Sequence, residues 1–395
     1  MTIEESTIAK TGRRLRLGMV GGGQGAFIGA VHRLAARMDD KYELVAGALS
    51  SDRQRAMASA VELRIAADRA YGSFAEMAVA EAAREDGIDV VSIVTPNHVH
   101  FDVAKAFLAA GIHVICDKPL TTTSAQAHEL VRLVSDSGLV FALTHNYTGY
   151  PMVRQAREMV RSGELGRIRV VQVEYAQDWL STKLEDSGQK QAEWRTDPAR
   201  SGAGGCIGDI GTHAYNLAGF ITGLELDSLS ADLSTFVEGR PLDDNVHIMM
   251  RYAGGARGML WSSQVAPGNE NGLRIRVYGE KAGLSWAQED PNYLHFTKLG
   301  EPPQLITRGG SGSGPVAGQA TRVPPGHPEG YLEGFANIYS DVAEVISARL
   351  ENRSPDPLAT TYPSVEDGAR GVVFIEAAVR SSGADGQWVD LKAGL

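Results

Sequence analysis

The sequence is poor in the features that mark disulfide-rich, membrane-spanning and nucleic-acid-binding proteins. Only two cysteines are present, Cys116 and Cys206, and their wide separation shows no metal-type spacing, which suits a reducing compartment. No apolar run reaches membrane-spanning length, and residues 1–10 lack the apolar core of a signal peptide. A net charge of −10 without a basic stripe argues against nucleic acid as a partner. We therefore expect a cytoplasmic protein that binds neither membranes nor nucleic acids.

The length and the hydrophobic pattern predict two domains. A chain of 395 residues is too long for one ordinary core, and its apolar and charged fractions, 43% and 22%, are typical of globular proteins. Strands and helices alternate up to about residue 145, after which longer strands with period-two alternation prevail. We expect a first domain over residues 1–145 and a second over residues 146–395.

Alternating strands and helices in the first domain predict an α/β fold with a doubly wound parallel sheet. The expected strands are residues 15–20, 42–49, 89–94, 113–116 and 139–143. A glycine-rich turn follows the first strand, and its spacing Gly21-x-Gly23-x-x-Ala26 meets the dinucleotide fingerprint. In that motif the N-terminus of the following helix faces the phosphates. We therefore expect a Rossmann domain that binds a dinucleotide.

The end of the second strand bears on the choice between NAD and NADP. The residues there are Ser50, Ser51, Asp52 and Arg53. An acid at the strand tip selects NAD by binding the ribose 2′-hydroxyl, whereas serine with arginine can hold a 2′-phosphate. Asp52 lies late for the NAD arrangement, and Arg53 could equally be a solvated residue of the next helix. These residues leave the choice open.

The most informative segment is Thr-Pro-Asn-His-Val-His at residues 95–100, which is followed one helix later by a strand and Asp117-Lys118-Pro119. Ligands bind at the carboxyl ends of parallel strands in open α/β sheets, so the amine of Lys118 is well placed to act on a substrate. His98 and His100 have no nearby third ligand, and we predict no metal site.

The second half of the chain predicts a large, mainly antiparallel sheet. Its expected strands are residues 168–175, 244–252, 258–265 and 273–278, with closing helices at 330–350 and 364–381. One face of such a sheet packs on helices and the other is free for a partner, so we expect a homodimer or homotetramer. The Gly-, Ser- and Pro-rich residues 300–328 are too long for an ordinary connection and are either mobile or an active-site cover.

Glycines surround a carboxylate and an imidazole at residues 201–213. Asp209 and His213 are expected one turn apart on the same face of a helix that begins near Cys206. Such a pair suits proton transfer, and an ordinary brace along the helix is the alternative. The neighbouring segments offer no third ligand with the spacing of a zinc site.

An aromatic ring and a guanidinium, Trp194 and Arg195, stand just before this glycine-rich loop. A flat ring suits the C–H faces of a sugar, and a fork of donors suits its hydroxyls. A local ion pair between Arg195 and Asp197 is the alternative. His327 could reach into a site, its own or a neighbouring subunit's, or simply lie at the surface.

Three ordered motifs resemble those of the glucose–fructose oxidoreductase/inositol dehydrogenase/rhizopine catabolism (Gfo/Idh/MocA) family, over essentially the whole chain. The family pattern Thr-Pro-Asn-x-x-His matches residues 95–100, Glu-Lys-Pro matches Asp117-Lys118-Pro119, and Gly-Gly-x-x-x-Asp-x-Gly-x-His matches residues 204–213. The resemblance implies Lys118, Asp209 and His213 as the catalytic set. It also implies a Rossmann domain followed by an α+β domain, with a large open sheet, that binds substrate and supports oligomerisation.

Within the family, residues 25–33, 194–198 and 264–270 are similar to the scyllo-inositol/L-glucose dehydrogenase branch. That similarity implies NAD(H) as the cofactor and a free cyclic polyol or hexose as the substrate. The usual family spacing between the third glycine and a histidine selects Gly29 and His32, which implies a short insertion in the phosphate loop.

The motifs and the resemblance together predict which residues contact the ligands. Cofactor contacts are expected from Gly21, Gly23, Gln24, Ala26, Phe27, Ile28, Ser50, Ser51, Arg53, Thr95, Pro96, Asn97, His100, Asp117 and Lys118. Substrate contacts are expected from Lys118, Asn146, Trp194, Arg195, Asp209, His213 and His327.

The expected activity is NAD- or NADP-dependent oxidation of a secondary ring hydroxyl of an inositol or hexose to the ketone. In this hypothesis His213 takes the hydroxyl proton, Lys118 stabilises the developing alkoxide, and Asp209 orients a hydroxyl or the imidazole. One alternative is a glycoside 3-dehydrogenase or an enzyme that cleaves glycosides through transient oxidation. Another is a non-catalytic dinucleotide-binding sensor, against which the joint presence of the lysine, aspartate and histidine argues.

Overall fold

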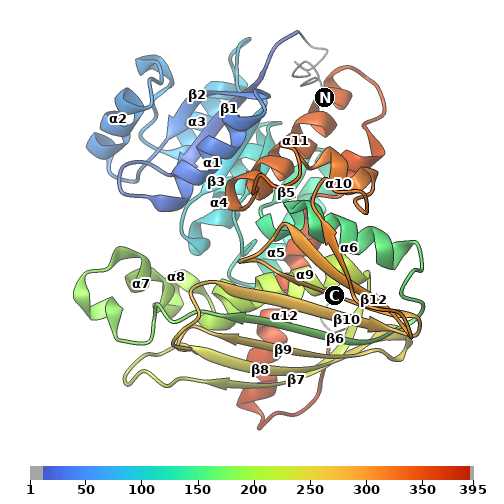
Figure 1. Cartoon of the computed structure of the whole chain (residues 1–395). Helices are drawn as coiled ribbons and strands as arrows, with labels where there is room; N and C mark the ends of the chain where they lie inside the picture. The colour runs from blue at the N-terminus through green and yellow to red at the C-terminus, as the bar shows by residue number, and fades with distance from the viewer. Residues whose placement is uncertain (1–11, 392–395) are drawn as a thin grey trace. The chain divides into compact units, whose positions relative to one another are not determined.

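The computed structural model describes residues 12–391, and contacts divide the chain into two compact units (Figure 1). The first unit contains the residues up to Thr121 together with Ala125–Gly149 and Tyr331–Ala369. The second contains Thr122–Ser124, Tyr150–Gly330 and the residues from Arg370 onward. Residues 1–10, where the sequence shows no signal-peptide core, lie outside the described residues. None of the described helices combines the length and the apolar character needed to span a lipid bilayer.

Five parallel strands form the sheet of the first unit, which confirms the predicted doubly wound fold. The strands are β1 (Leu15–Gly21), β2 (Tyr42–Ala48), β3 (Val90–Val94), β4 (His113–Cys116) and β5 (Phe141–Leu143). The helices are α1 (Phe27–Met38), α2 (Arg53–Glu62), α3 (Phe74–Ala82), α4 (His100–Ala109), α5 (Ser124–Ser137) and α11 (Tyr331–Leu350). The strand order β2-β1-β3-β4-β5 changes direction between β1 and β3, where ligands bind in sheets of this kind.

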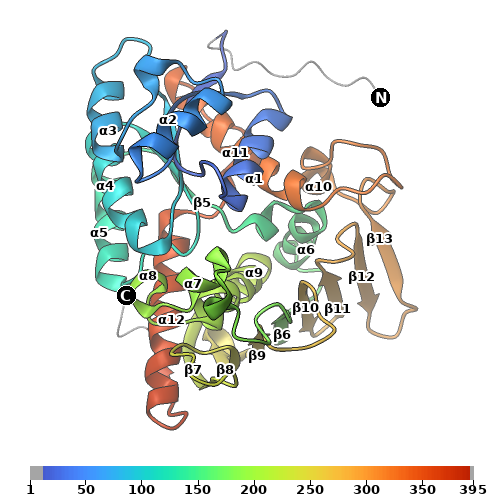
Figure 2. The ribbon, with the colours of Figure 1, turned by 90° about the vertical axis from the view of Figure 1, so that its left-hand side faces the viewer.

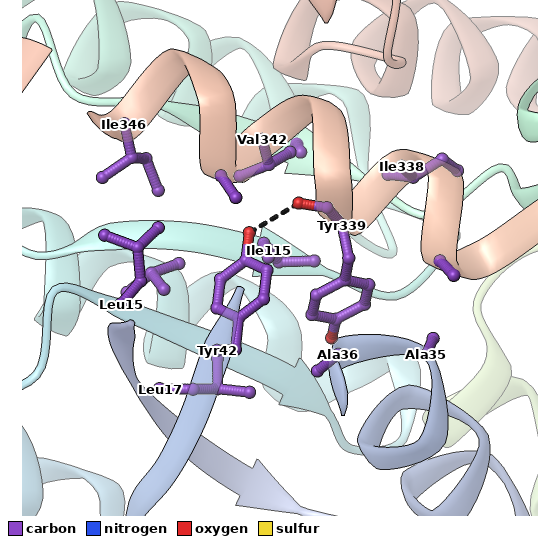
Figure 3. Close-up of a cluster of buried hydrophobic side chains, with 14 of the residues drawn as sticks. Leu15, Leu17, Ala35, Ala36, Tyr42, Ile115, Ile338, Tyr339, Val342 and Ile346 are labelled. Carbon is purple, nitrogen blue, oxygen red and sulfur yellow. Dashed lines mark hydrogen bonds between the residues drawn. The ribbon is translucent and has the colours of Figure 1, made fainter. Parts of the chain in front are cut away.

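Helix α11 comes from the far end of the chain and packs with α1 on the sheet of the first unit. Figure 3 shows apolar side chains of α11, among them Ile346, over Leu15 of β1. In the same cluster the hydroxyl of Tyr42 donates a hydrogen bond of 2.7 Å to the carbonyl oxygen of Tyr339. This apolar face explains why a late helix belongs to the first unit.

Buried histidines are a feature of the first unit. The ring nitrogen Nδ1 of His32 lies 2.9 Å from the hydroxyl of Tyr339, which in turn lies 2.8 Å from the hydroxyl of Ser92. Burial lowers the pKa of His32 to about 4, and it lowers the pKa of His113 to about 4 and that of His145 to about 3. All three imidazoles are therefore neutral at pH 7 in the folded protein.

We expect acid to destabilise the first unit through these three histidines. In the unfolded chain each binds a proton below about pH 6.5, whereas in the folded protein each stays neutral down to about pH 4. The free energy of unfolding should therefore fall as the pH drops from about 6.5 to about 4, by up to about 1.4 kcal/mol per pH unit for each histidine. Chemical denaturation followed by circular dichroism between about pH 7 and about pH 5 measures this slope.

The variant His32→Asn should reduce that slope, and replacement of the exposed His295 by glutamine should leave it unchanged. A free energy of unfolding that does not depend on pH over this range contradicts the assignment of neutral buried imidazoles.

Nine strands form one sheet in the second unit, in the order β13-β12-β11-β10-β6-β9-β8-β7-β14. The strands are β6 (Ile168–Ala176), β7 (Leu226–Ser234), β8 (Asn245–Tyr252), β9 (Arg257–Ser263), β10 (Gly272–Gly279), β11 (Ala282–Ala287), β12 (Tyr293–Lys298), β13 (Gln304–Thr307) and β14 (Val389–Asp390). The helices are α6 (Pro151–Arg161), α7 (Lys190–Arg195), α8 (Pro198–Ser201), α9 (Thr212–Thr222), α10 (Pro315–Gln319) and α12 (Val365–Gly383). Only β6 and β9 pair in parallel, so the predicted mainly antiparallel sheet is confirmed.

The two faces of this sheet differ. Helices α6 and α9 pack along one face (Figure 2), and alternate residues such as Ile248 of β8 and Leu260 of β9 are buried. On the other face Met249 is 55% exposed and Met259, its partner on β9, is 51% exposed. The alternation predicted from the sequence thus leaves an exposed, partly apolar sheet surface.

Residues 300–328 contain a strand and a helix of their own, β13 and α10. A buried guanidinium organises the far end of this stretch, because Arg308 donates to the carbonyl oxygen of Val323 at 2.7 Å and to the Glu329 carboxylate at 3.0 Å. Glu329 also accepts the backbone N–H groups of Arg322 and Val323, at 2.7 and 2.9 Å. A buried ion pair therefore holds the end of this stretch within the second unit.

Candidate active site

The glycine-rich loop leads from β1 into α1. Gly21, Gly22 and Gly25 have φ angles of 80°, 72° and 77°, a region that glycine adopts without steric cost. A Cβ at Gly21 would lie 2.8 Å from the carbonyl oxygen of Val94, so the loop runs directly against the end of β3. The loop therefore provides the tight turn and bare backbone that a pyrophosphate site requires.

Gly29 fills the packing position that the fingerprint spacing assigned to Ala26. A Cβ on Gly29 would lie 2.3 Å from the Cα of Gly22, so only glycine fits where α1 meets the loop. Ala26 instead precedes the first turn of α1, with φ and ψ of −100° and 115°. The structure thus favours the longer spacing that the family resemblance selects.

The N-terminus of α1 is suited to an anion. Ala26 provides no side-chain cap, and the first turn carries no acidic residue. The first N–H groups of a helix have no intrahelical acceptor and attract phosphate. The side-chain nitrogen of Gln24 donates to the carboxylate of Glu62 on α2 at 3.1 Å. At the start of α1, Phe27 is 66% exposed and Ile28 is half-buried. These residues fit the pyrophosphate of a dinucleotide.

The tip of β2 presents serines, and Asp52 is used as a helix cap. The Asp52 carboxylate accepts the N–H of Arg55 at 2.7 Å, and the Asp52 N–H donates to the Ser50 hydroxyl at 3.2 Å. Ser51 and Arg53 are exposed beside it. The Asp52 carboxylate, one residue after the serines, therefore caps α2, in agreement with its late position in the sequence.

Lys118 follows β4 on a turn whose backbone is tied down on both sides. The Asp117 carboxylate accepts the N–H of Lys118 at 2.9 Å. The buried ring of His100 lies 2.8 Å from the carbonyl oxygen of Pro119 through Nδ1 and 2.9 Å from that of Thr95 through Nε2. His100 thereby joins the segments that follow β3 and β4, and Lys118 lies between these fixed points.

Two polar groups that follow β3 and β5 are buried without a hydrogen-bond partner among residues 12–391. They are the hydroxyl of Thr95 and the side-chain nitrogen of Asn146. Pro96 and the buried Asn97 continue the segment after Thr95. Buried polar groups are normally hydrogen-bonded. Hydroxyl, amide and phosphate groups of a bound dinucleotide or polyol match these orphaned groups, so the first unit fits the predicted cofactor.

Asp209 and His213 lie on consecutive turns of one helical segment in the second unit. Asp209 belongs to the π-helical turn Ile207–Gly211, and His213 is the second residue of α9. Such turns are rare and are frequent at functional sites. The ring of Tyr175, from β6, lies edge-on to the His213 ring with the centroids 6.2 Å apart. The predicted helix is present, with a wider turn at the aspartate.

Two side chains anchor the Asp209 carboxylate. Its Oδ2 accepts from Nε of Arg195 at 3.2 Å and from Nε2 of Gln264 at 2.9 Å. The alternative ion pair between Arg195 and Asp197 is wrong, because Arg195 pairs with Asp209 and the Asp197 carboxylate accepts the N–H of Ala199 at the start of α8. Sequence reasoning did not identify Gln264 as a site residue, although its place directly after an alternating strand, β9, was a usable indication.

Arg195 is packed among aromatic rings. Its guanidinium carbon lies 4.2 Å from the ring centroid of Trp194 and 6.0 Å from that of Trp179. Nη1 of Arg195 donates to the side chain of Gln191 at 2.6 Å. Flat rings beside fixed donors and acceptors are suited to a sugar or cyclitol. Trp179 is a further aromatic group that the sequence analysis missed.

His327 lies at the surface, which was the alternative to its reaching into a site. It is exposed, and its backbone carbonyl accepts from the buried Arg308 guanidinium. The structure thus gathers Thr95, His100, Asp117 and Lys118 in the first unit. In the second unit it gathers Arg195, Asp209, His213 and Gln264.

Two family models match the sequence. Residues 15–158 match an oxidoreductase family with an NAD-binding Rossmann fold, and residues 153–285 match the GFO/IDH/MocA C-terminal domain. The predicted cofactor class is therefore confirmed, and NAD is the nucleotide named for the matching fold.

Known proteins resemble the whole chain. The crystal structure of an oxidoreductase from Sinorhizobium meliloti is 56% identical, with a TM-score of 0.87, and covers 95% of this chain and 99% of its own. An inositol dehydrogenase homologue from Azotobacter vinelandii, complexed with NADH and myo-inositol, is 37% identical with a TM-score of 0.88, covering 95% and 97%. Levoglucosan dehydrogenase from Pseudarthrobacter phenanthrenivorans is 28% identical over 96% of this chain and 98% of its own length.

Proposed function

The chain belongs to the GFO/IDH/MocA family of NAD-binding oxidoreductases, and from this membership we propose that it oxidises a secondary ring hydroxyl of a cyclic polyol or hexose to the ketone. Bound NAD+ supplies the hydride acceptor for such a reaction. The substrates that the proposal favours are scyllo-inositol, myo-inositol and a free hexose such as L-glucose.

In this proposal the catalytic set is Lys118, Asp209 and His213. An imidazole nitrogen of His213 takes the proton of the substrate hydroxyl. Nζ of Lys118 donates a hydrogen bond to the same oxygen and stabilises the negative charge that develops on it. Asp209, held by Arg195 and Gln264, accepts from a neighbouring hydroxyl or orients the imidazole.

The observation that carries this proposal is the fixed orientation of the Asp209 carboxylate, one turn before His213. Two donors, Arg195 and Gln264, converge on one of its oxygens. A non-catalytic nucleotide sensor does not need a carboxylate held in one orientation one helical turn from an imidazole. The structure that holds NADH and myo-inositol, at 37% identity, supports a cyclitol as the substrate class.

The direct test is the initial rate of NADH formation with a panel of inositols, D- and L-hexoses, methyl glucosides and levoglucosan, with NAD+ and NADP+ compared. Rapid NAD+ reduction with an inositol or a free hexose is the expected result. Rapid NAD+ reduction only with glycosides or levoglucosan would make those compounds the proposed substrates instead. They are the main alternative because levoglucosan dehydrogenase is among the relatives. Tight NADH binding with no reduction across the panel would contradict the dehydrogenase proposal.

We also propose that the exposed face of the nine-stranded sheet binds a second copy of the chain. Met249 and Met259 stand side by side on this face, on paired positions of β8 and β9. Apolar side chains grouped on an open sheet are typical of subunit interfaces. We therefore expect a dimer or tetramer by light scattering, and a smaller species for Met259→Glu.

Val79, on α3 of the first unit, is 73% exposed and provides the matched control. Val79→Glu introduces the same charge at another exposed apolar position and should leave the mass unchanged. A monomeric wild type at micromolar concentration, or a Met259→Glu protein of unchanged mass, would contradict this assembly.

A further inference from the structure

A buried carboxylate outside the proposed catalytic set holds the start of the helical segment that carries Asp209 and His213. Asp243 lies in the connection between β7 and β8 and is 8% exposed. Its Oδ1 accepts the N–H of Gly205 at 2.6 Å, and its Oδ2 accepts the N–H of Ile207 at 2.8 Å. Both oxygens therefore accept from the backbone where the π-helical turn begins.

Backbone contacts reinforce this attachment. The N–H of Cys206 donates to the carbonyl oxygen of Asp243 at 2.8 Å, so three successive N–H groups meet one residue. A Cβ at Gly205 would lie 2.3 Å from that carbonyl oxygen, which shows how closely the two backbones approach. The glycine before the turn is thus required by contact with Asp243.

The connection that supplies Asp243 is itself fixed. The adjacent carboxylate of Asp244 accepts the N–H groups of Phe236 and Val237, at 2.9 and 3.0 Å. Nη1 of Arg240, whose side chain is 1% exposed, donates to Asp244 at 3.2 Å, and Nε of Arg240 donates to Glu185 at 3.0 Å. The connection around Asp243 is therefore held in place by these contacts. Loss of a hydrogen bond from the Asp243 carboxylate should then move the π-helical turn and not the connection.

We propose that Asp243 is a positioning residue for the reaction, whose carboxylate fixes the turn that orients Asp209 and His213. This inference rests on the proposed function, because it assumes that the Asp209–His213 segment carries the chemistry. Geometry of this kind matters because a misplacement of about 1 Å can lower turnover by about a hundredfold.

The protonation state of Asp243 should matter as well. Burial raises the pKa of Asp243 to about 6, although the N–H groups of Ile207 and Gly205 act to lower it, and the neighbouring Asp244 adds a smaller upward shift. The Cys206 thiol interacts with Asp243, Asp209 and Asp244 act on the same thiol, and Arg240 pairs with Asp244 on the connection. Burial raises the pKa of the Cys206 thiol, which stays neutral. Below about pH 6 a protonated Asp243 would donate through one oxygen, and one N–H of the turn would lose its acceptor.

The test compares the wild type with Asp243→Asn, which keeps the shape and one acceptor oxygen. We expect kcat to fall by about 10- to 100-fold, while the affinity for NADH, measured by fluorescence titration, is unchanged. The wild-type kcat should fall more steeply below about pH 6 than that of the variant, because only the wild type can protonate the Asp243 carboxylate. The matched control is Asp356→Asn, a carboxylate of the first unit that caps the turn Pro357–Thr360, and it should leave kcat and its pH profile unchanged.

A second measurement on the unmodified protein decides the matter if the asparagine variant does not fold. The amide resonances of selectively labelled Gly205 and Ile207 should shift with a midpoint near pH 6, and kcat should fall over the same pH range. A kcat that stays level while these amides titrate would overturn the proposal, as would an Asp243→Asn protein with wild-type kcat. A wild type inactive on the whole substrate panel would instead reject the proposed function, and the amide titration would still report whether Asp243 holds the turn.

Discussion

Replacing Lys118 with alanine is expected to lower turnover by about three orders of magnitude while leaving the affinity for NADH nearly unchanged. Loss of a positioned donor to a developing oxyanion lowers rates by about 10²- to 10³-fold. The lysine backbone is held through Asp117 and the adjoining Pro119 through His100, so removal of the side chain should leave the turn in place. Single-turnover reduction of NAD+ and fluorescence titration with NADH measure the two quantities separately.

Lys105 provides the matched control, because it is also a lysine of the first unit but lies exposed on α4 and pairs with Glu129 at 2.7 Å. Lys105→Ala should retain full turnover. If Lys118→Ala stays within about tenfold of the wild type, Lys118 does not stabilise the developing alkoxide.

Replacing Gly29 with alanine is expected to weaken NAD+ binding by about 5- to 150-fold. The added Cβ would lie 2.3 Å from the Cα and 2.7 Å from the carbonyl oxygen of Gly22, both backbone atoms that cannot rotate away. Overpacking of this kind costs about 1–3 kcal/mol. We expect most of that free energy to be lost from cofactor affinity, because relief of the contact displaces the phosphate loop. Isothermal titration with NAD+ gives the dissociation constant directly.

Gly383 tests whether any added methyl group on a helical glycine has this effect. It ends α12, and a Cβ there would meet no atom within 4 Å. Gly383→Ala should bind NAD+ like the wild type. Equal NAD+ affinity for Gly29→Ala would show that Gly29 is not the packing glycine of the phosphate loop.

Local pattern was sufficient for most of the fold. The strand at 113–116 coincides with β4, and the expected strand at 168–175 is β6 to within one residue. These elements are short apolar or alternating runs bounded by turn residues, and such runs depend little on distant contacts. The single domain boundary after residue 145 stays a prediction. Periodicity showed that residues 330–350 form a helix, but it could not show that Tyr339 would meet His32 in the first unit.

Site residues that belong to a sequence motif could be predicted. Contacts between segments that are distant in the sequence could not. The lysine after β4 and the aspartate–histidine pair follow from spacing along the chain. The partner of Arg195 does not, because Asp197 is nearer in sequence while Asp209 is the one it contacts. Gln264 and Asp243 meet the helical segment only after the sheet has formed, so no local pattern identifies the groups they contact.

The measurement that tests the central claim most directly is hydride transfer from a ring carbon to NAD. Ring-perdeuterated scyllo-inositol, myo-inositol or hexose is incubated with the enzyme and NAD+, and both products are analysed by mass spectrometry and NMR. The account predicts one deuterium at C4 of the nicotinamide and a ketone that has lost one deuterium from the ring. Reduced cofactor without deuterium, or no reduced cofactor with any of these substrates, would contradict it.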